Sequence, residues 1–449
     1  MDTLRRSFPA DIRRTLDGLP ETLDETYERT LLGIEKEKRE YAHRLFQCLT
    51  VSVRPFRVEE LAEVLAIRFD AGSPPEYHVD WRLEDAQEAV LSACSSLVTV
   101  VNVDGSPIVQ FSHFSVKEFL TSSRLAAARE SLSCYHVISQ SAHAILAQAS
   151  LSVLLRLDGQ VDKNNIKNFP LAGYAARHWV DHGQFENVSP SIKDAMEPLF
   201  DPEKPQFATW VWIYDLDRPW KEHIPGSLPT RPEAGPLYYA ALCGFRDLVE
   251  HLVVAYPRDV NAKGGSHATP LHAALDKGNV DIALYLLDYD ADVNDMDIEK
   301  ASPLHKASLR GRRGTVQLLL EHDADVNIRN PEGQTPLHLA SHEGELEVAR
   351  ILLQHGADAE SRDNEGWTPL LTASKSGHHE VVKLLLESGV DVDSPDNDGW
   401  TPLHSASDRH LDVVRALLEH GADVKSCSKG GWTPYHVASQ KGHLGILQL

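Results

Sequence analysis

The sequence predicts a mainly α-helical protein whose second half is a solenoid of short stacked repeats. Prolines recur at positions 236, 270, 303, 336, 369, 402 and 434, with spacings of 34, 33, 33, 33, 33 and 32 residues. Each stands in a variant of Thr-Pro-Leu-His, followed by small residues, a turn, an apolar run and a close resembling "GADV". A period of this length is typical of units that complete one hydrophobic core only by stacking.

The sequence of each repeat predicts two short helices and a projecting turn. Thr335 can cap the first helix with its hydroxyl, and Pro336 fits the first helical position, where no N–H is needed. Gly344 can end this helix in a left-handed conformation. The second helix buries one face, formed by Val348, Ile351, Leu352 and Leu353. Between units, "DNEG" and "DNDG" have turn chemistry and should project as hairpin fingers.

With the period and the phrase "TPLH-x-A" in view, residues 235–449 resemble seven ankyrin repeats, the last of them truncated. Leu371 replaces the motif's His, Tyr435 its Leu and Ser302 its Thr. The 32-residue step contains "SASDRHLDVV", which lacks the glycine between the helices. We therefore expect a distorted turn near Arg409 and a locally weaker repeat.

Residues 26–129 predict helices followed by a two-stranded hairpin. Residues 22–50 place Tyr41, Leu45, Phe46 and Leu49 on one helical face, "VEELAEVLAIRF" forms a second helix, and residues 84–94 a third. "LVTVVNVDGSPIVQFSH" alternates around Asp104-Gly105, which is a hairpin signal. This order describes a winged-helix-like domain.

Residues 130–234 predict a helical connector rich in Pro and aromatic residues, packed onto the first repeat. We expect Trp179, Trp210 and Trp212 to lie in its core rather than in a site.

The segments "LPETLDETYERTLLGI", "YAHRLFQCLTVSVRPFRVEELAEVLA", "FSHFSVKEFL" and "PLAGYAARHW" resemble the region after the nucleotide-binding domain of fungal NACHT-ankyrin proteins. That family consists of signal-transducing ATPases similar to immune receptors. The resemblance implies that residues 1–25 are a helical lead-in, the tail of a lid behind an ATPase. No G-x-x-x-x-G-K-[ST] loop occurs in the sequence, so the phosphate cradle is missing. At the other end, "GHLGILQL" stops inside a second helix without a polar capping repeat, so we expect both ends to be cut.

Composition argues against several function classes. The 44 basic and 66 acidic residues give a formal charge of −22, which repels phosphate backbones, so no nucleic-acid partner is expected. The second predicted helix, which we take to be the one that would enter a DNA groove, is acidic at Glu59, Glu60 and Glu63. Five scattered cysteines without a C-x-x-C pair suit a reducing, cytoplasmic location. No apolar run is long enough for a membrane span.

The histidines recur in register rather than converging on one point, so we interpret them as structural. His272, His305, His338, His404 and His436 stand near a helix start, whereas His322, His355 and His420 stand at the end of the second helix. We expect no catalytic site, no metal and no cofactor.

The candidate protein-binding residues fall into two sets. Trp367, Trp400 and Trp432 occupy one finger position in successive units, where they either stack finger on finger or form a contact strip. The second set varies just before each turn between helices, and an ordinary solvated face is the alternative for each: Leu309, Arg310, His342, Glu343, Lys375, Ser376, Asp408, Arg409, Gln440 and Lys441.

These observations favour a non-enzymatic intracellular scaffold whose repeats recognise another protein as the sensing surface of a receptor-like signalling protein. Residues 235–449 carry 19 basic and 32 acidic residues, a difference of −13, which favours a partner with a basic segment over an acidic one, with solubility as the alternative. A second hypothesis makes the chain the regulatory half of a NACHT-type switch whose ATPase lies upstream or on a partner. The oligomeric state is open.

Overall fold

Two units make up the chain in the computed structural model, Met1–Pro232 and Glu233–Leu449. The structure describes residues 22–69, 75–82, 84–159, 161–162, 164–219 and 231–449. Most of the expected lead-in over residues 1–25 therefore lies outside the described residues.

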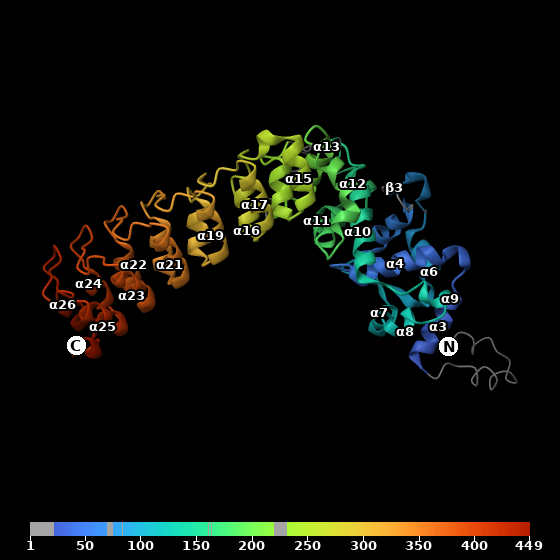
Figure 1. The fold of residues 1–449 in the computed structure, drawn as a ribbon. Helices are drawn as coiled ribbons and strands as arrows, with labels where there is room; N and C mark the ends of the chain where they lie inside the picture. The colour runs from blue at the N-terminus through green and yellow to red at the C-terminus, as the bar shows by residue number, and fades with distance from the viewer. Residues whose placement is uncertain (1–21, 70–74, 83, 160, 163, 220–230) are drawn as a thin grey trace. The chain divides into compact units, whose positions relative to one another are not determined.

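The first unit is mainly helical, with short strands near its start (Figure 1). Its elements are α3 (Leu23–Leu32), η1 (Lys36–Lys38), α4 (Arg39–Val51), β1 (Phe56–Arg57), α5 (Val58–Glu63), η2 (Val64–Ala66), β2 (Ile67–Arg68), β3 (Glu76–Tyr77), η3 (Val79–Trp81), α6 (Ala86–Cys94), η4 (Ser95–Leu97), β4 (Val98–Val103), β5 (Ser106–Phe111), α7 (Phe114–Leu120), α8 (Ser123–Ala126), α9 (Glu130–Ser133), α10 (Ser139–Leu154), η5 (Ile166–Asn168), α11 (Ala172–Gly183), α12 (Ser189–Leu199) and α13 (Pro205–Ile213).

Helices α4, α5 and α6 and the sheet β1-β5-β4 form the expected winged helix. The wing is the antiparallel hairpin β4–β5, in which Val100 pairs with Val109. Asp104 and Gly105 form its turn with φ values of 49° and 79°, as the Asp-Gly dipeptide predicts. Strand β1 completes the sheet by pairing Phe56 with Val109.

The core of this domain includes the fully buried side chains of Leu45 and Phe46 on α4. The expectation that Tyr41 shares their buried face is wrong, because its side chain is 42% exposed. Tyr41 lies in the first turn of α4, where the Arg44 guanidinium lies 5.9 Å from the ring centroid. The ring thus covers a cation at the rim of the domain.

The acidic character of α5 is structural, which corrects the argument that it repels DNA. Glu60 and Glu63 are buried, and only Glu59 of the three acids is exposed. Arg54 forms an ion pair of 2.6 Å with Glu60. Glu63 pairs with Arg82 and accepts hydrogen bonds from the Tyr77 hydroxyl and from the Leu171 N–H. These partners satisfy both charges inside the domain.

The helical connector has an aromatic core. Trp179 and Trp210 are fully buried, with ring centroids 5.4 Å apart, and the Trp210 indole N–H donates to the Ala176 carbonyl over 3.0 Å. The core assignment is confirmed for these two residues. Trp212 is only half-buried, because it lies two positions after Trp210 and so on another face of α13.

The second unit is a row of helix pairs separated by loops (Figure 1). Its elements are α14 (Pro236–Cys243), α15 (Arg246–Ala255), η6 (Pro257–Asp259), α16 (Pro270–Lys277), α17 (Val280–Asp288), α18 (Pro303–Leu309), α19 (Arg313–Glu321), α20 (Pro336–Glu343), α21 (Leu346–Gln354), α22 (Pro369–Ser376), α23 (His379–Glu387), α24 (Pro402–Ala406), α25 (Leu411–Glu419), α26 (Pro434–Lys441) and α27 (Leu444–Leu447).

The sequence signals of one repeat fold as expected. Thr335 caps α20 with Pro336 at its first position, and Gly344 ends it with φ of 79°. In α21 the side chains of Val348, Ile351 and Leu352 are buried. Leu353, expected with them, is only half-buried, because it lies about 100° further around the helix than Leu352.

The repeat without the glycine between its helices is distorted, as expected near Arg409. Its first helix, α24, has 5 residues, whereas α20 and α22 have 8. Ser407 follows α24 in a right-handed conformation, with φ of −66°. The lower stability of this repeat stays a prediction.

We predict that Leu352→Ala lowers the free energy of unfolding by about 2 to 5 kcal/mol, because it removes buried apolar surface and leaves a cavity between repeats. Chemical denaturation followed by circular dichroism measures the change. Leu353→Ala on the same helix is the matched control and should cost less. Equal effects of the two substitutions would contradict the assigned buried face.

Candidate protein-binding groove

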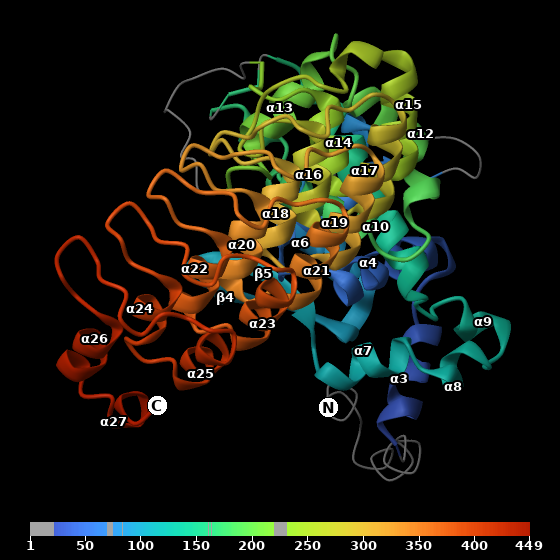
Figure 2. The ribbon, with the colours of Figure 1, turned by 60° about the vertical axis from the view of Figure 1, so that its left-hand side comes forward.

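The fingers of the array are tight turns built by their own side chains. The Asp363 carboxylate accepts the Trp367 N–H over 2.8 Å, and the Asp396 carboxylate accepts the Trp400 N–H over the same distance. Gly366 closes the first of these turns with φ of 83°, which a residue with a Cβ rarely adopts. The fingers lie on the side of the first helices α20, α22 and α24 (Figure 2).

Successive fingers are joined through their backbones. The N–H of Asn364 donates to the Glu332 carbonyl over 3.0 Å, and the N–H of Asn397 donates to the Glu365 carbonyl over 3.0 Å. Lys429 repeats the bond to the Asp398 carbonyl over 2.9 Å. These bonds fix the spacing of neighbouring finger tips.

A groove of ≈ 760 Å³ lies between the fingers and the first helices of the last three repeats. It runs over α24, the shortest first helix of the array. Seven of the candidate residues line it: Trp367, Lys375, Trp400, Asp408, Arg409, Gln440 and Lys441. Two residue classes chosen by different sequence criteria therefore meet on one surface.

The tryptophans make different contacts along the groove. The Lys375 ammonium nitrogen lies 3.9 Å from the ring centroid of Trp367. The ring of Trp400 lies beside His404, with centroids 5.5 Å apart. Trp432 is 38% exposed and lies near His436, but it is outside the lining of this groove. Two of the three tryptophans, Trp367 and Trp400, therefore line the groove, and their role as a contact strip or as a finger stack stays a prediction.

Asp408 joins neighbouring repeats across the groove. Its carboxylate lies 3.1 Å from Lys441 and 3.4 Å from Arg409. The hydrogen bond from Lys441 is the main cause that lowers the pKa of Asp408 below its usual value. The carboxylate is therefore ionised and held in place at neutral pH.

The remaining candidates lie outside this groove. Leu309 is exposed, and Arg310 forms an ion pair of 2.5 Å with Asp276. His342 and Glu343 belong to an earlier repeat, on α20, where the His342 ring lies 2.8 Å from the Glu343 carboxylate. Ser376 follows Lys375 but is absent from the lining.

Sequence reasoning missed two finger-tip acids in the lining, Glu365 and Asp398. Together with Glu332 they recur every 33 residues, always just before the finger's glycine. This regular spacing is a signal that the sequence already contained.

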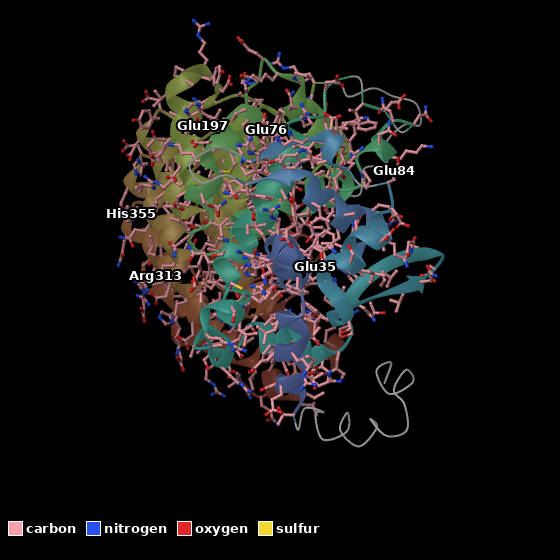
Figure 3. The ribbon with its side chains drawn as sticks, turned by 90° about the vertical axis from the view of Figure 1, so that its right-hand side faces the viewer. Glu35, Glu76, Glu84, Glu197, Arg313 and His355 are labelled. Atoms are coloured by element: carbon pink, nitrogen blue, oxygen red, sulfur yellow. The ribbon has the colours of Figure 1, made fainter. Side chains whose placement is uncertain are left out.

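The second helices form a separate edge of the array. Figure 3 labels Arg313 at the start of α19 and His355 at the end of α21, and both lie along this edge. The His355 ring bonds the Ile351 carbonyl over 2.9 Å, which satisfies the end of its own helix.

Three of the histidines at the helix starts, His305, His338 and His404, couple their repeat to the next. The His338 ring N–H at Nε2 donates to the Trp367 carbonyl over 2.9 Å, while its Nδ1 bonds Thr335. His404 makes the same bond to the Trp432 carbonyl. Burial lowers the pKa of both rings, which favours the neutral form that these bonds require.

Within the described ranges, no helix is long and apolar enough to span a membrane. The same part of the chain contains no group of three side chains placed to hold a metal ion.

Comparison with protein families matches both halves of the chain. Ankyrin repeats match residues 237–330, 324–396 and 388–449. The winged helix domain of GPI inositol-deacylase matches residues 27–130.

Two known proteins are similar to the chain over different lengths. Azaphilone pigments biosynthesis cluster protein L of Monascus ruber is 32% identical over 306 residues, which cover 64% of this chain and 63% of that protein. Alpha-latrocrustotoxin-Lt1a of Latrodectus tredecimguttatus is 38% identical over 64 residues, or 14% of this chain and 4% of the toxin. The chain therefore spans less than two thirds of either relative.

We predict that folding stability falls as the pH is lowered from 7 to 5. Burial lowers the pKa of His272 to about 4 and lowers the pKa values of His305, His338 and His404. Between the folded pKa and the unfolded value near 6.5, the unfolded chain binds more protons, so protons favour unfolding. His272 alone should cost roughly 2 kcal/mol at pH 5.

Urea denaturation at both pH values measures this loss. His338→Leu copies Leu371, the residue that the next repeat has at this position, and should reduce the difference between the two pH values. A free energy of unfolding that is the same at pH 7 and pH 5 would contradict the lowered pKa values of the buried histidine rings.

Proposed function

We propose that this chain, an array of ankyrin repeats preceded by a winged helix domain, is a non-enzymatic scaffold that recognises another protein through its groove. Ankyrin repeats are generally protein-binding. The observation that carries the proposal is the gathering of Trp367, Trp400 and the residues before the turns in one groove of ≈ 760 Å³. Aromatic side chains in a concave surface are typical centres of binding energy.

The charges of the groove support a protein rather than a nucleic acid as partner. Glu365, Asp396 and Asp398 of the fingers line it, so phosphates would meet acidic residues there. Lys375, Arg409 and Lys441 provide cations at the other ends of the first helices. A polypeptide segment can match this mixture of charges residue by residue.

A receptor-like signalling role is the finer part of the proposal. It is supported by the order of winged helix, connector and array, which resembles the regulatory region of fungal NACHT-ankyrin proteins. The match to a protein of a Monascus ruber pigment cluster agrees with a fungal setting. In this role the array is the sensing surface.

A cytoplasmic location belongs to the same proposal. Cys48, Cys94 and Cys243 are buried free thiols, and Cys134 and Cys427 are exposed free thiols. Free thiols persist in a reducing compartment.

We predict that a photo-cross-linking amino acid placed at Gln440 captures a protein partner from cells that express the full chain. Gln440 is exposed and lines the groove, so a bound segment would lie within reach. Mass spectrometry of the cross-linked product identifies the partner and the segment attached.

The same amino acid at Arg415, an exposed position on the second helix α25, is the matched control and should not capture that partner. Trp367→Leu combined with Trp400→Leu should abolish capture at Gln440. Capture that survives the double substitution, or that is equal at Arg415, would place recognition elsewhere.

The alternative proposal makes the chain the regulatory and sensing half of an ATP-driven switch. The winged helix match supports it, because this domain stands where the resembled family relays its nucleotide state. No G-x-x-x-x-G-K-[ST] loop occurs in the sequence, so ATP hydrolysis would have to come from an upstream segment or a partner.

We predict that the chain of 449 residues binds no Mg-ATP in isothermal titration calorimetry, because it lacks the backbone cradle and lysine that hold the phosphates. A partner recovered by cross-linking tests the alternative directly: ATPase activity in the partner supports the switch. Saturable micromolar binding of ATP to the chain alone would contradict the switch with an upstream ATPase as well as the switch with an ATPase on a partner.

A further inference from the structure

One tryptophan of the groove already has a cation on its ring. The Lys375 ammonium lies 3.9 Å from the centroid of Trp367, and both residues belong to the same repeat. The negative face of an indole ring attracts a positive charge at this distance. The contact between Lys375 and Trp367 therefore shows how a tryptophan of this groove can hold a lysine side chain.

The next repeat has the ring but not the cation. Lys375 follows Trp367 by the same number of positions as Asp408 follows Trp400. Asp408 is held by Lys441 and Arg409. In the described part of the chain, no lysine or arginine lies over the ring of Trp400, although this ring borders the groove.

Acidic finger tips lie on the same side of the groove. Glu365 and Asp398 are exposed and occupy equivalent positions in successive fingers. The bond from the Asn397 N–H to the Glu365 carbonyl fixes their backbones relative to each other. A cation on Trp400 would therefore approach fingers that carry two acidic residues, and the backbones of these fingers are fixed before binding.

We propose that the groove binds an extended basic peptide segment, with one lysine or arginine side chain stacked on Trp400 in the way that Lys375 stacks on Trp367. The proposal rests on the protein-recognition function above and specifies the chemistry of the partner. Arg409 and Lys441 lie near the ends of the first helices α24 and α26, whereas Glu365 and Asp398 belong to the fingers, so the finger side of the groove favours the basic side chain.

The experiment uses the full chain and two fluorescein-labelled probes, octalysine and octaglutamate, with fluorescence anisotropy at 150 mM salt. Octalysine should bind and octaglutamate should not. Trp400→Leu should weaken octalysine binding roughly three- to tenfold, because the ring face is lost, whereas Trp400→Phe should retain most of the affinity.

A second variant tests the same idea in the opposite direction. Lys375→Met frees the ring of Trp367 and should tighten octalysine binding. Arg409→Gln is its control, because it removes the same charge without freeing a ring, and it should tighten binding less. Circular dichroism checks that each variant is folded. If Trp400→Leu does not fold, octalysine binding by Lys375→Met tests the proposal instead.

The acidic finger tips have their own control. Glu365→Gln combined with Asp398→Asn should weaken octalysine binding and reduce its dependence on salt. Glu419→Gln, at an exposed position on α25, should leave binding unchanged.

The proposal is overturned if Trp400→Leu binds octalysine as tightly as the original chain and Lys375→Met binds no tighter than Arg409→Gln. Binding would then follow overall charge rather than the ring. If octalysine does not bind while Gln440 still cross-links a protein, the basic-segment inference is wrong and the protein-recognition function stands. If cross-linking also fails, both are wrong.

Discussion

The burial of each repeat's apolar face against the next repeat is the constraint on which the array depends. Two helices of 8 and 9 residues, such as α20 and α21, are too short to be stable alone. Leu352, Leu385 and Leu417 are fully buried in successive second helices, so each repeat completes its neighbour's core. The same stacking brings the His338 ring to the Trp367 carbonyl, and this bond joins a helix start to the next finger.

The groove follows from these connections rather than from a separate structural device. Because finger tips bond one another through Asn364 and Asn397, their side chains are held at the spacing of the repeats. The core can therefore keep one pattern while the exposed positions change from Lys375 to Asp408 to Gln440. This separation of constant interior and variable surface explains how one architecture can present a specific set of contacts.

Much of the fold could be predicted because its signals are local and repeated. Thr335, Pro336 and Gly344 each specify a backbone position, and Asp104-Gly105 specifies the wing. The predictions of buried and exposed side chains failed where burial depends on segments that are distant in the sequence. Glu63 looks like a solvated acid until Arg82, Tyr77 and Leu171 surround it. For the site, the sequence identified seven lining residues, but it could not show that they line one groove over α24 or that Leu309 and Arg310 lie outside it.

The most direct test of the account is hydrogen–deuterium exchange of the full chain with and without the partner recovered by cross-linking. Protein recognition through the groove predicts that backbone amides of the fingers at residues 363–367 and 396–400 exchange more slowly when the partner is bound. The second helices α23 and α25 should be unaffected. Slower exchange confined to those helices, or to residues 26–129, would contradict the central claim that the groove is the recognition surface.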